Sequence, residues 1–350
     1  MNRRAVHFVG SFPADTTEGA MRAMLDAAGP RLRTLPTGET RRYEFYIRPI
    51  IENLVQQGVL EVDRPREWRS SRDRTRHRVP RGGRLVAEAL DLGYRSEAEE
   101  ALPIFRQLCP DHATSGTALQ IGMPTDFTLA FIALGVTGVF RHRAAFAAAT
   151  AREITRIREL AGDQVVIQLE ATAELVLMAS AQPLHRPVDT VLGLARGIAG
   201  IAAAAPAGTR FGVHLCLGSL HNKARATLRD TRPLVDLANA IVRHWPPDRP
   251  LEFLHAPLAA GDVPPPDRPE FYAPLRRLAL GAQTAFYAGV VHETPTDEEQ
   301  LHLLSLVEDA LGRPVDGVAS ACGLGRRPRV VADALLTRAE RTAAGGESGV

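Results

Sequence analysis

A chain of 350 residues, 45% of them hydrophobic, can bury a large core, and at this length one α/β barrel is as ordinary as two smaller domains. The 42 basic and 40 acidic residues leave a formal charge of +2, which excludes a strong overall attraction to nucleic acid or to an anionic membrane. No apolar run approaches the ~20 residues that span a bilayer, and the N-terminus shows no long apolar signal segment, so we expect a cytoplasmic protein.

Short β-rich runs alternate with longer helical patterns along the chain, which indicates βα units around a parallel sheet. Strands are predicted at residues 6–9, 85–92, 118–122, 165–169, 213–217, 251–255, 286–291 and 315–319. Helices are predicted at residues 17–28, 41–57, 97–108 and 144–161. Eight strands with intervening helices predict a single (β/α)8 TIM-type barrel at residues 1–340, followed by a flexible tail at 341–350.

Segment 64–84 does not fit this alternation, because it holds nine arginines, Trp68 and almost no apolar periodicity. We interpret it as an arginine-rich insertion after the first βα unit. Three roles stay open for it. It is a solvated loop, a clamp over the barrel mouth that binds an anionic substrate or cofactor through arginine forks, or a nucleic-acid contact. The last role is the weakest, since the segment has one aromatic residue and no recognisable module.

Polar side chains with metal-binding or catalytic chemistry stand at or just beyond the ends of predicted strands. They are Ser11, Glu170, His214, Cys216, His255, His292 and Cys322. In a barrel the carboxyl ends of the strands converge on one mouth, so these residues become neighbours. His214 and Cys216 share one face of their strand, because successive side chains alternate. Cysteine and histidine are preferred zinc ligands, so the sequence predicts a zinc site, although each residue taken alone is ordinarily a structural one.

The three cysteines of the chain are too few for a disulfide scaffold. In a reducing compartment such thiols are buried fillers or metal-binding and catalytic groups. We interpret Cys109, in a helical stretch, as a buried filler and the other two as metal ligands.

A series of short motifs carries a resemblance to a known family. They are Val9-Gly10-Ser11-Phe12-Pro13, Gly38-Glu39, Ile167-Gln168-Leu169-Glu170, His214-Leu215-Cys216, Val291-His292 and Cys322-Gly323-Leu324. In this order they resemble the catalytic barrel of cobalamin-independent methionine synthase and its relatives in the uroporphyrinogen-decarboxylase-like superfamily. The resemblance extends from the first predicted strand to the last.

The resemblance implies roles for individual residues. Zn²⁺ would be bound by His214, Cys216 and Cys322, and Ser11 and Glu39 would hold an amino-acid substrate. His292 and Glu170 would be the catalytic residues, with His292 handling protons beside the metal.

The fourth metal ligand is a departure from the family. Methionine synthases have a glutamate ligand at the end of the sixth strand, where this chain has His255. Glu252 lies three residues earlier and so faces away from His255 by strand alternation. We therefore predict His255 as the fourth ligand.

The function implied is that of a zinc-dependent transferase, similar to 5-methyltetrahydropteroyltriglutamate–homocysteine methyltransferase. It would activate a small substrate thiol as a metal-bound thiolate for S-methylation or S-alkylation. A metal-dependent lyase or decarboxylase of the same superfamily is the alternative, and a non-enzymatic zinc-binding protein is the third. No nucleic-acid or membrane partner is expected, and the donor, the acceptor and the oligomeric state stay open.

Overall fold

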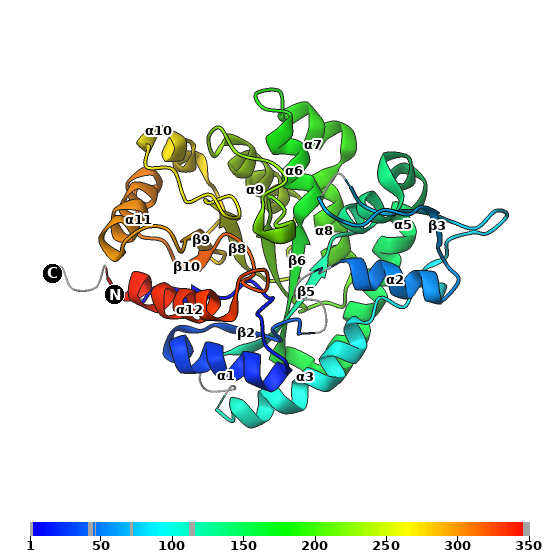
Figure 1. The fold of residues 1–350 in the computed structure, drawn as a ribbon, viewed down its shortest axis with the longest axis horizontal. Coiled ribbons are helices and arrows are strands. Elements are labelled where there is room, and N and C mark those ends of the chain that lie inside the picture. The colour runs from blue at the N-terminus through cyan, green and yellow to red at the C-terminus, as the bar shows by residue number, and fades with distance from the viewer. Residues whose placement is uncertain (1–2, 41–44, 46, 71–72, 112–115, 346–350) are drawn as a thin grey trace.

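The computed structural model describes residues 3–40, 45, 47–70, 73–111 and 116–345. Within these residues eight parallel strands form one sheet, in the order β1-β10-β9-β8-β7-β6-β5-β2. The strands are β1 (Ala5–His7), β2 (Thr34–Pro36), β5 (Ala118–Pro124), β6 (Val165–Ala171), β7 (Arg210–Leu215), β8 (Leu251–Pro257), β9 (Ala285–Val291) and β10 (Gly317–Ser320). An isolated parallel bridge between Val6 and Leu32 joins the two ends of the sheet, so it curls into a nearly closed barrel (Figure 1). The predicted α/β TIM-type barrel is confirmed.

Helices surround the barrel (Figure 1). They are α1 (Thr17–Ala28), α2 (Arg48–Gln56), α3 (Tyr94–Leu108), α5 (Asp126–Ala161), α6 (Thr172–Ser180), α7 (Arg186–Leu192), α8 (Leu194–Ala204), α9 (Arg232–His244), α10 (Pro269–Tyr272), α11 (Asp297–Leu311) and α12 (Arg329–Ala344). Among the described helices α5 is long and apolar enough by composition to cross a membrane. It is interrupted at Gly135, however, and buries Phe127, Phe146 and Ile154 in the protein core.

The second barrel strand lies elsewhere than predicted. Segment 85–92 contains a short 3-10 helix, Ala87–Ala89, and belongs to a loop that buries Leu90 and Leu92. The strand is β2, which pairs with β5 through Thr34, Leu35 and Pro36. The strand β2 has three residues and ends in proline, so it is too short to show the alternation typical of strands. The loop at 85–92 shows a similar alternation because its leucines are buried.

The arginine-rich segment is also placed differently from the prediction. It follows β2 and α2, so it lies between the second and third barrel strands rather than after the first βα unit. Part of it forms an antiparallel pair of strands, β3 (Glu61–Arg64) and β4 (Arg76–Arg78), which extends from the barrel (Figure 1). We call residues 61–78 the arginine hairpin.

The C-terminal helix α12 continues to Ala344, and Thr342 and Ala343 are buried. The start of the tail predicted at 341–350 is therefore helical, because these side chains pack on the barrel. Residues 346–350 lie outside the described part of the chain.

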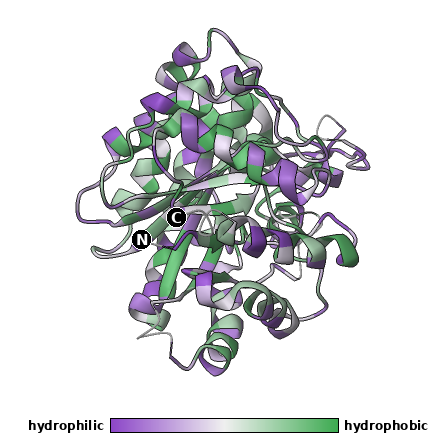
Figure 2. Ribbon diagram, turned by 90° about the vertical axis from the view of Figure 1, so that its left-hand side faces the viewer, coloured by the Kyte–Doolittle hydropathy of each residue, from purple (hydrophilic) through white to green (hydrophobic). Residues whose placement is uncertain are grey.

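The inside of the barrel is closely packed. Gly212 on β7 faces the Phe253 ring on β8, and a Cβ at position 212 would overlap that ring. Phe253 in turn stacks on Tyr287, with the ring centroids 5.1 Å apart. Figure 2 shows hydrophobic colour along the central strands and hydrophilic colour mainly on the outer elements. The interior is thus a packed floor under the mouth, not a channel.

Candidate metal centre

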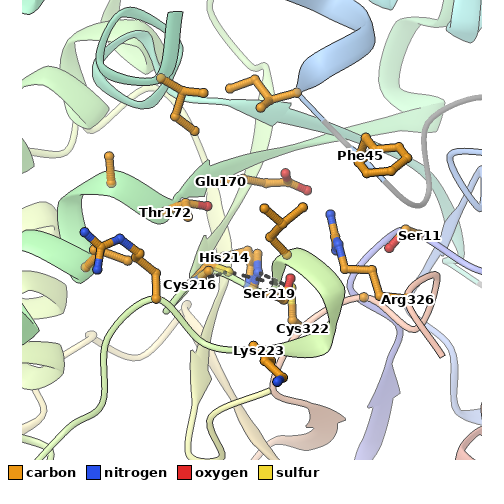
Figure 3. Close-up of a pocket in the computed structure, with 18 of the residues that line it drawn as sticks. Ser11, Phe45, Glu170, Thr172, His214, Cys216, Ser219, Lys223, Cys322 and Arg326 are labelled. Atoms are coloured by element: carbon orange, nitrogen blue, oxygen red, sulfur yellow. Dashed lines mark hydrogen bonds between the residues drawn. The ribbon is translucent and has the colours of Figure 1, made fainter. Parts of the chain in front are cut away.

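The strand register sets three polar side chains at the same height at the carboxyl end of the barrel. Glu170 on β6 pairs with His214 on β7, and His214 pairs with His255 on β8. Cys216 follows β7 directly, and Cys322 lies two residues beyond β10. The loops after these strands bring the two cysteines to the same point (Figure 3).

His214, Cys216 and Cys322 form a compact group of metal-binding atoms, all within 4.8 Å of one another. The two Sγ atoms are 3.6 Å apart, and Cys322 Sγ is 3.8 Å from His214 Nε2. Ligands arranged tetrahedrally around Zn²⁺, at ~2.3 Å for sulfur and ~2.0 Å for nitrogen, lie roughly 3.4–3.8 Å from one another. The donor types and their spacing therefore fit zinc. Within the described residues no other group of three or more such side chains reaches this arrangement.

Both sulfur atoms are contacted by the loop that follows β7. The Gly218 N–H donates to Cys216 Sγ at 3.3 Å, and Ser219 Oγ lies 3.1 Å from Cys322 Sγ. The contact with Cys216, together with His214 and Arg326, lowers the pKa of Cys322 well below its ordinary value against the effect of burial. The same contact, with burial, raises the pKa of Cys216. The two thiols thus share one local environment in which negative charge is favoured on Cys322 rather than on Cys216.

His255 lies behind this group rather than in it. Its Nε2 is 3.0 Å from the Ser320 carbonyl oxygen, which can only accept, so Nε2 carries a hydrogen. Burial, with His214 and His7 nearby, lowers the pKa of His255 well below its ordinary value, so the ring is neutral and Nδ1 is an acceptor. His214 Nδ1, 2.7 Å away, must then donate to it.

This chain of hydrogen bonds has two consequences. It leaves the lone pair of His214 on Nε2, the atom that faces the thiols, and so fixes the tautomer that binds a metal. It also occupies both ring nitrogens of His255. In this arrangement His255 orients His214 and lies outside the group of His214, Cys216 and Cys322, so its prediction as the fourth ligand has no support from the geometry. As expected, Glu252 faces away and forms an ion pair with Arg210.

A cavity of about 320 Å³ opens above the three metal-binding side chains (Figure 3). Ser11, Glu39 and Glu170 line it, as the sequence predicted for residues near the mouth. Its other walls are largely apolar and include Phe45, Ile47, Trp68, Phe131, Val176 and Leu177. The cavity thus extends from His214, Cys216 and Cys322 to a largely apolar wall.

The carboxylates of Glu39 and Glu170 approach each other over Gly122. A Cβ on Gly122 would lie 2.6 Å from Glu170 Oε1 and 3.1 Å from Glu39 Oε1. Gln168 Nε2 donates to Glu170 Oε1 at 3.1 Å, and Glu39 is held with a positive φ of 50°. A non-glycine residue rarely adopts this backbone conformation, so the surrounding structure holds Glu39 in place. Two carboxylates therefore lie side by side in one wall of the cavity.

His292 is not among the residues that line the cavity. Its Nε2 lies 3.1 Å from the Gly261 carbonyl oxygen, and its Nδ1 accepts the Thr294 N–H at 3.2 Å. Both ring nitrogens of His292 are bonded to backbone groups, which holds the ring in the loop after β9. A catalytic role for His292 stays a prediction.

Cations in the cavity wall were not assigned from the sequence. The cavity is lined by four of them: Arg74 of the arginine hairpin, Lys223, Arg225 and Arg326. The neutral Ser219 also lines it. The sequence offered one signal, the arginine-rich segment. The other cations lie in loops, where their side chains have no periodicity that would reveal them.

No family model matches the chain, and no curated protein matches it. Solved structures match it over nearly its whole length. A B12-independent methionine synthase from a Shewanella species, in complex with selenomethionine, has a TM-score of 0.64 and 13% identity, covering 99% of this chain and 98% of that one. The fold is that of the B12-independent methionine synthases.

Two further solved structures share this fold over nearly the whole chain. A methyltransferase from Methanosarcina mazei has a TM-score of 0.57 and 13% identity, over 97% of this chain and 94% of that chain. A protein from Listeria monocytogenes, described as a vitamin-B12-independent methionine synthase, has a TM-score of 0.54 and 11% identity, over 98% and 99% of the two chains. At such identities the likeness concerns the fold, so the chemistry has to be argued from the site.

Proposed function

We propose that this protein is a zinc-dependent transferase that transfers a methyl or other alkyl group to the sulfur of a small thiol. The observation that carries the proposal is the group His214, Cys216 and Cys322 on the floor of the cavity. It stands at the carboxyl end of a barrel that methyltransferases share, which is the end where such barrels place their active sites. We also propose a cytoplasmic location, where substrate thiols stay reduced.

The three side chains would hold the ion, and His255 would hold His214. When bound, Zn²⁺ lowers the pKa of a substrate thiol, so that the thiol reacts as a thiolate near neutral pH. Three protein ligands leave a coordination position for the substrate, as in other catalytic zinc sites.

The residues of the wall bind and orient the substrate. Glu39 and Glu170 would accept hydrogen bonds from a substrate amino group, and Ser11, buried against Gly323, would fix its neighbouring atoms. Phe45 and Trp68 line the cavity with apolar surface and would help to exclude water from a bound substrate. Exclusion of water favours transfer of the alkyl group to sulfur over its hydrolysis.

The proposal is tested with Co²⁺-substituted protein, because sulfur bound to Co²⁺ absorbs in the near ultraviolet. Addition of 2-mercaptoethanol or homocysteine is expected to add a sulfur-to-metal band to the native protein and to Cys109→Ser, but not to Cys322→Ser. Cys109 lies at the end of α3, outside the metal-binding group, and serves as the matched control. No response to thiols, with a response to simple carboxylates instead, would favour the lyase over the transferase.

A further inference from the structure

His7 is a buried histidine that the metal-binding group does not include. It is the last residue of β1 and is 1% exposed. Its ring packs against the rings of Phe253 and Tyr287, with centroid distances of 4.7 Å and 5.0 Å. Its Nε2 lies 3.1 Å from Oε1 of Gln168 on β6. Strands β1 and β6 are not neighbours in the sheet, so this hydrogen bond crosses the inside of the barrel.

The side-chain amide of Gln168 has one orientation that its surroundings allow. Its Nε2 lies 2.6 Å from the Val9 carbonyl oxygen and 3.1 Å from Glu170 Oε1, and both of these oxygens accept hydrogen bonds. Reversal of the amide would place its oxygen against two other oxygens, one of them in a carboxylate. Nε2 of Gln168 therefore donates both of its hydrogens, and Oε1 faces His7.

His7 is the donor in its hydrogen bond with Gln168. An amide oxygen can only accept, so Nε2 of His7 carries a hydrogen. Burial, with His214 nearby, lowers the pKa of His7 from 6.5 to about 3, so at neutral pH the ring is neutral and holds no second hydrogen. Its Nδ1 has no hydrogen-bond partner among the described residues. The single N–H of the ring thus serves the contact with Gln168.

Hydrogen bonds run from His7 through Gln168 to Glu170. On β6, Gln168 stands two residues before Glu170, so both side chains point to the same face of the strand and Gln168 is the deeper of the two. His7 fixes the Gln168 amide, and the amide donates to a carboxylate that lines the cavity. A residue below the cavity therefore acts on a residue in its wall.

The Glu170 carboxylate occupies a space that two glycines leave open. A Cβ on Gly10 would lie 2.6 Å from Glu39 Oε1 and 3.9 Å from Glu170 Oε1, and a Cβ on Gly122 would lie 2.6 Å from Glu170 Oε1. Neither position has a side chain that confines the carboxylate. The direction of the Glu170 carboxylate therefore depends on its hydrogen bonds, and Gln168 supplies one of them.

We propose that His7 is a positioning residue of the candidate site, which holds the Glu170 carboxylate, through Gln168, in the orientation that binds the amino group of a substrate. The inference rests on the proposed function and adds to it a residue that belongs neither to the metal-binding group nor to the cavity wall. Without the donor at position 7, the Gln168 oxygen is buried without a partner, and the amide loses its fixed orientation toward Glu170.

The test measures how much an amino group adds to the binding of a thiol. Homocysteine and 4-mercaptobutyrate share the same carbon chain, thiol and carboxylate, and differ only in the amino group. Their dissociation constants are measured from the sulfur-to-metal band of the Co²⁺-substituted, full-length protein. The native protein is expected to bind homocysteine about tenfold more tightly, a difference of ~1.4 kcal/mol.

Two substitutions of similar size separate the hydrogen bond of His7 from its packing. His7→Gln keeps an N–H that can donate to Gln168 Oε1, whereas His7→Met has a similar length and no donor. His7→Met is expected to reduce the preference for homocysteine to about twofold, and His7→Gln to retain most of it. Phe253→Leu is the control for packing, because it changes the ring beside His7 and leaves the hydrogen bonds of Gln168 in place. It should lower stability and keep the preference.

A double-variant cycle shows whether the effect passes through Gln168. Gln168→Leu removes the donor to Glu170 and should lose the preference on its own. In that background His7→Met should change the preference no further, because both substitutions break the same chain of contacts. If His7→Met does not fold, His7→Phe takes its place, because it keeps a ring against Phe253 and Tyr287.

The outcomes separate this inference from the proposed function. Equal affinity of the native protein for the two thiols, a preference that His7→Met retains, or effects of the His7 and Gln168 substitutions that add would each overturn the inference and leave the proposed function standing. Absence of any thiol-dependent band in the native protein overturns the proposed function and this inference with it.

Discussion

The Nδ1 atoms of His214 and His255 lie 2.7 Å apart, and the outer nitrogen of His255 is bonded to the carbonyl oxygen of Ser320. Ser320 is the last residue of β10, two positions before Cys322. One hydrogen-bonded chain thus runs from His214 through His255 to the end of β10, close to Cys322.

The role of His255 can be separated from that of a ligand by substitution. His255→Phe removes the acceptor for His214 and should weaken zinc binding on the order of 10- to 100-fold, as loss of such partners does. His255→Gln should retain most of the affinity, because its amide can accept from His214 and donate to Ser320. Competition with a chromogenic zinc chelator measures the zinc affinity of both variants. The control is His302→Gln, because His302 is exposed. If the Gln variant binds as weakly as the Phe variant, His255 is a ligand after all.

Metal content should follow the two clustered cysteines. Cys216→Ser and Cys322→Ser each remove one of the sulfur donors and are expected to lose most of the zinc found in the native protein. Cys109→Ser should keep it, since Cys109 lies outside the group. Elemental analysis of the folded proteins decides the matter, and full zinc content in both clustered variants would contradict the assignment.

What the sequence could predict depended on length and periodicity. Strand alternation correctly placed His214 and Cys216 in one site, because β7 is long enough to show it. The strand β2 is three residues long and left no such signal. The role of His255 was beyond prediction, since it depends on which ring nitrogen faces which atom across two neighbouring strands. The arginines of the cavity converge through loops, whose paths no period describes.

A buried carboxyl group should make stability depend on pH. Glu174 accepts hydrogen bonds from Thr125 and Thr128, yet burial raises its pKa from 4.5 to about 7. Because the folded state holds the proton more tightly than the unfolded state, stability should fall as pH rises from about 4.5 to about 7.

Glu174→Gln mimics the protonated form and should remove that dependence. The native protein should lose on the order of 3 kcal/mol of unfolding free energy through Glu174 between pH 4.5 and pH 8, and the variant should not show this loss. Urea unfolding at both pH values measures it. A native protein and variant whose stabilities change in parallel would show that Glu174 does not titrate in this range.

The packing inside the barrel should tolerate no added atom at Gly212. Gly212→Ala places a methyl group on the Phe253 ring and is expected to cost about 1–3 kcal/mol of unfolding free energy. Gly200→Ala is the matched control in helix α8, where a Cβ meets nothing within 4 Å, and it should stabilise the protein by about 0.5–1 kcal/mol. Equal effects of the two changes would mean that Phe253 moves aside freely.

The most direct test of the account is X-ray absorption at the zinc edge, which counts the sulfur atoms bound to the ion. The native protein should show two sulfur ligands, from Cys216 and Cys322, and a third after addition of a substrate thiol. A protein that binds no zinc, or one whose sulfur count stays at two in saturating thiol, would contradict the claim that this barrel activates a thiol at that site.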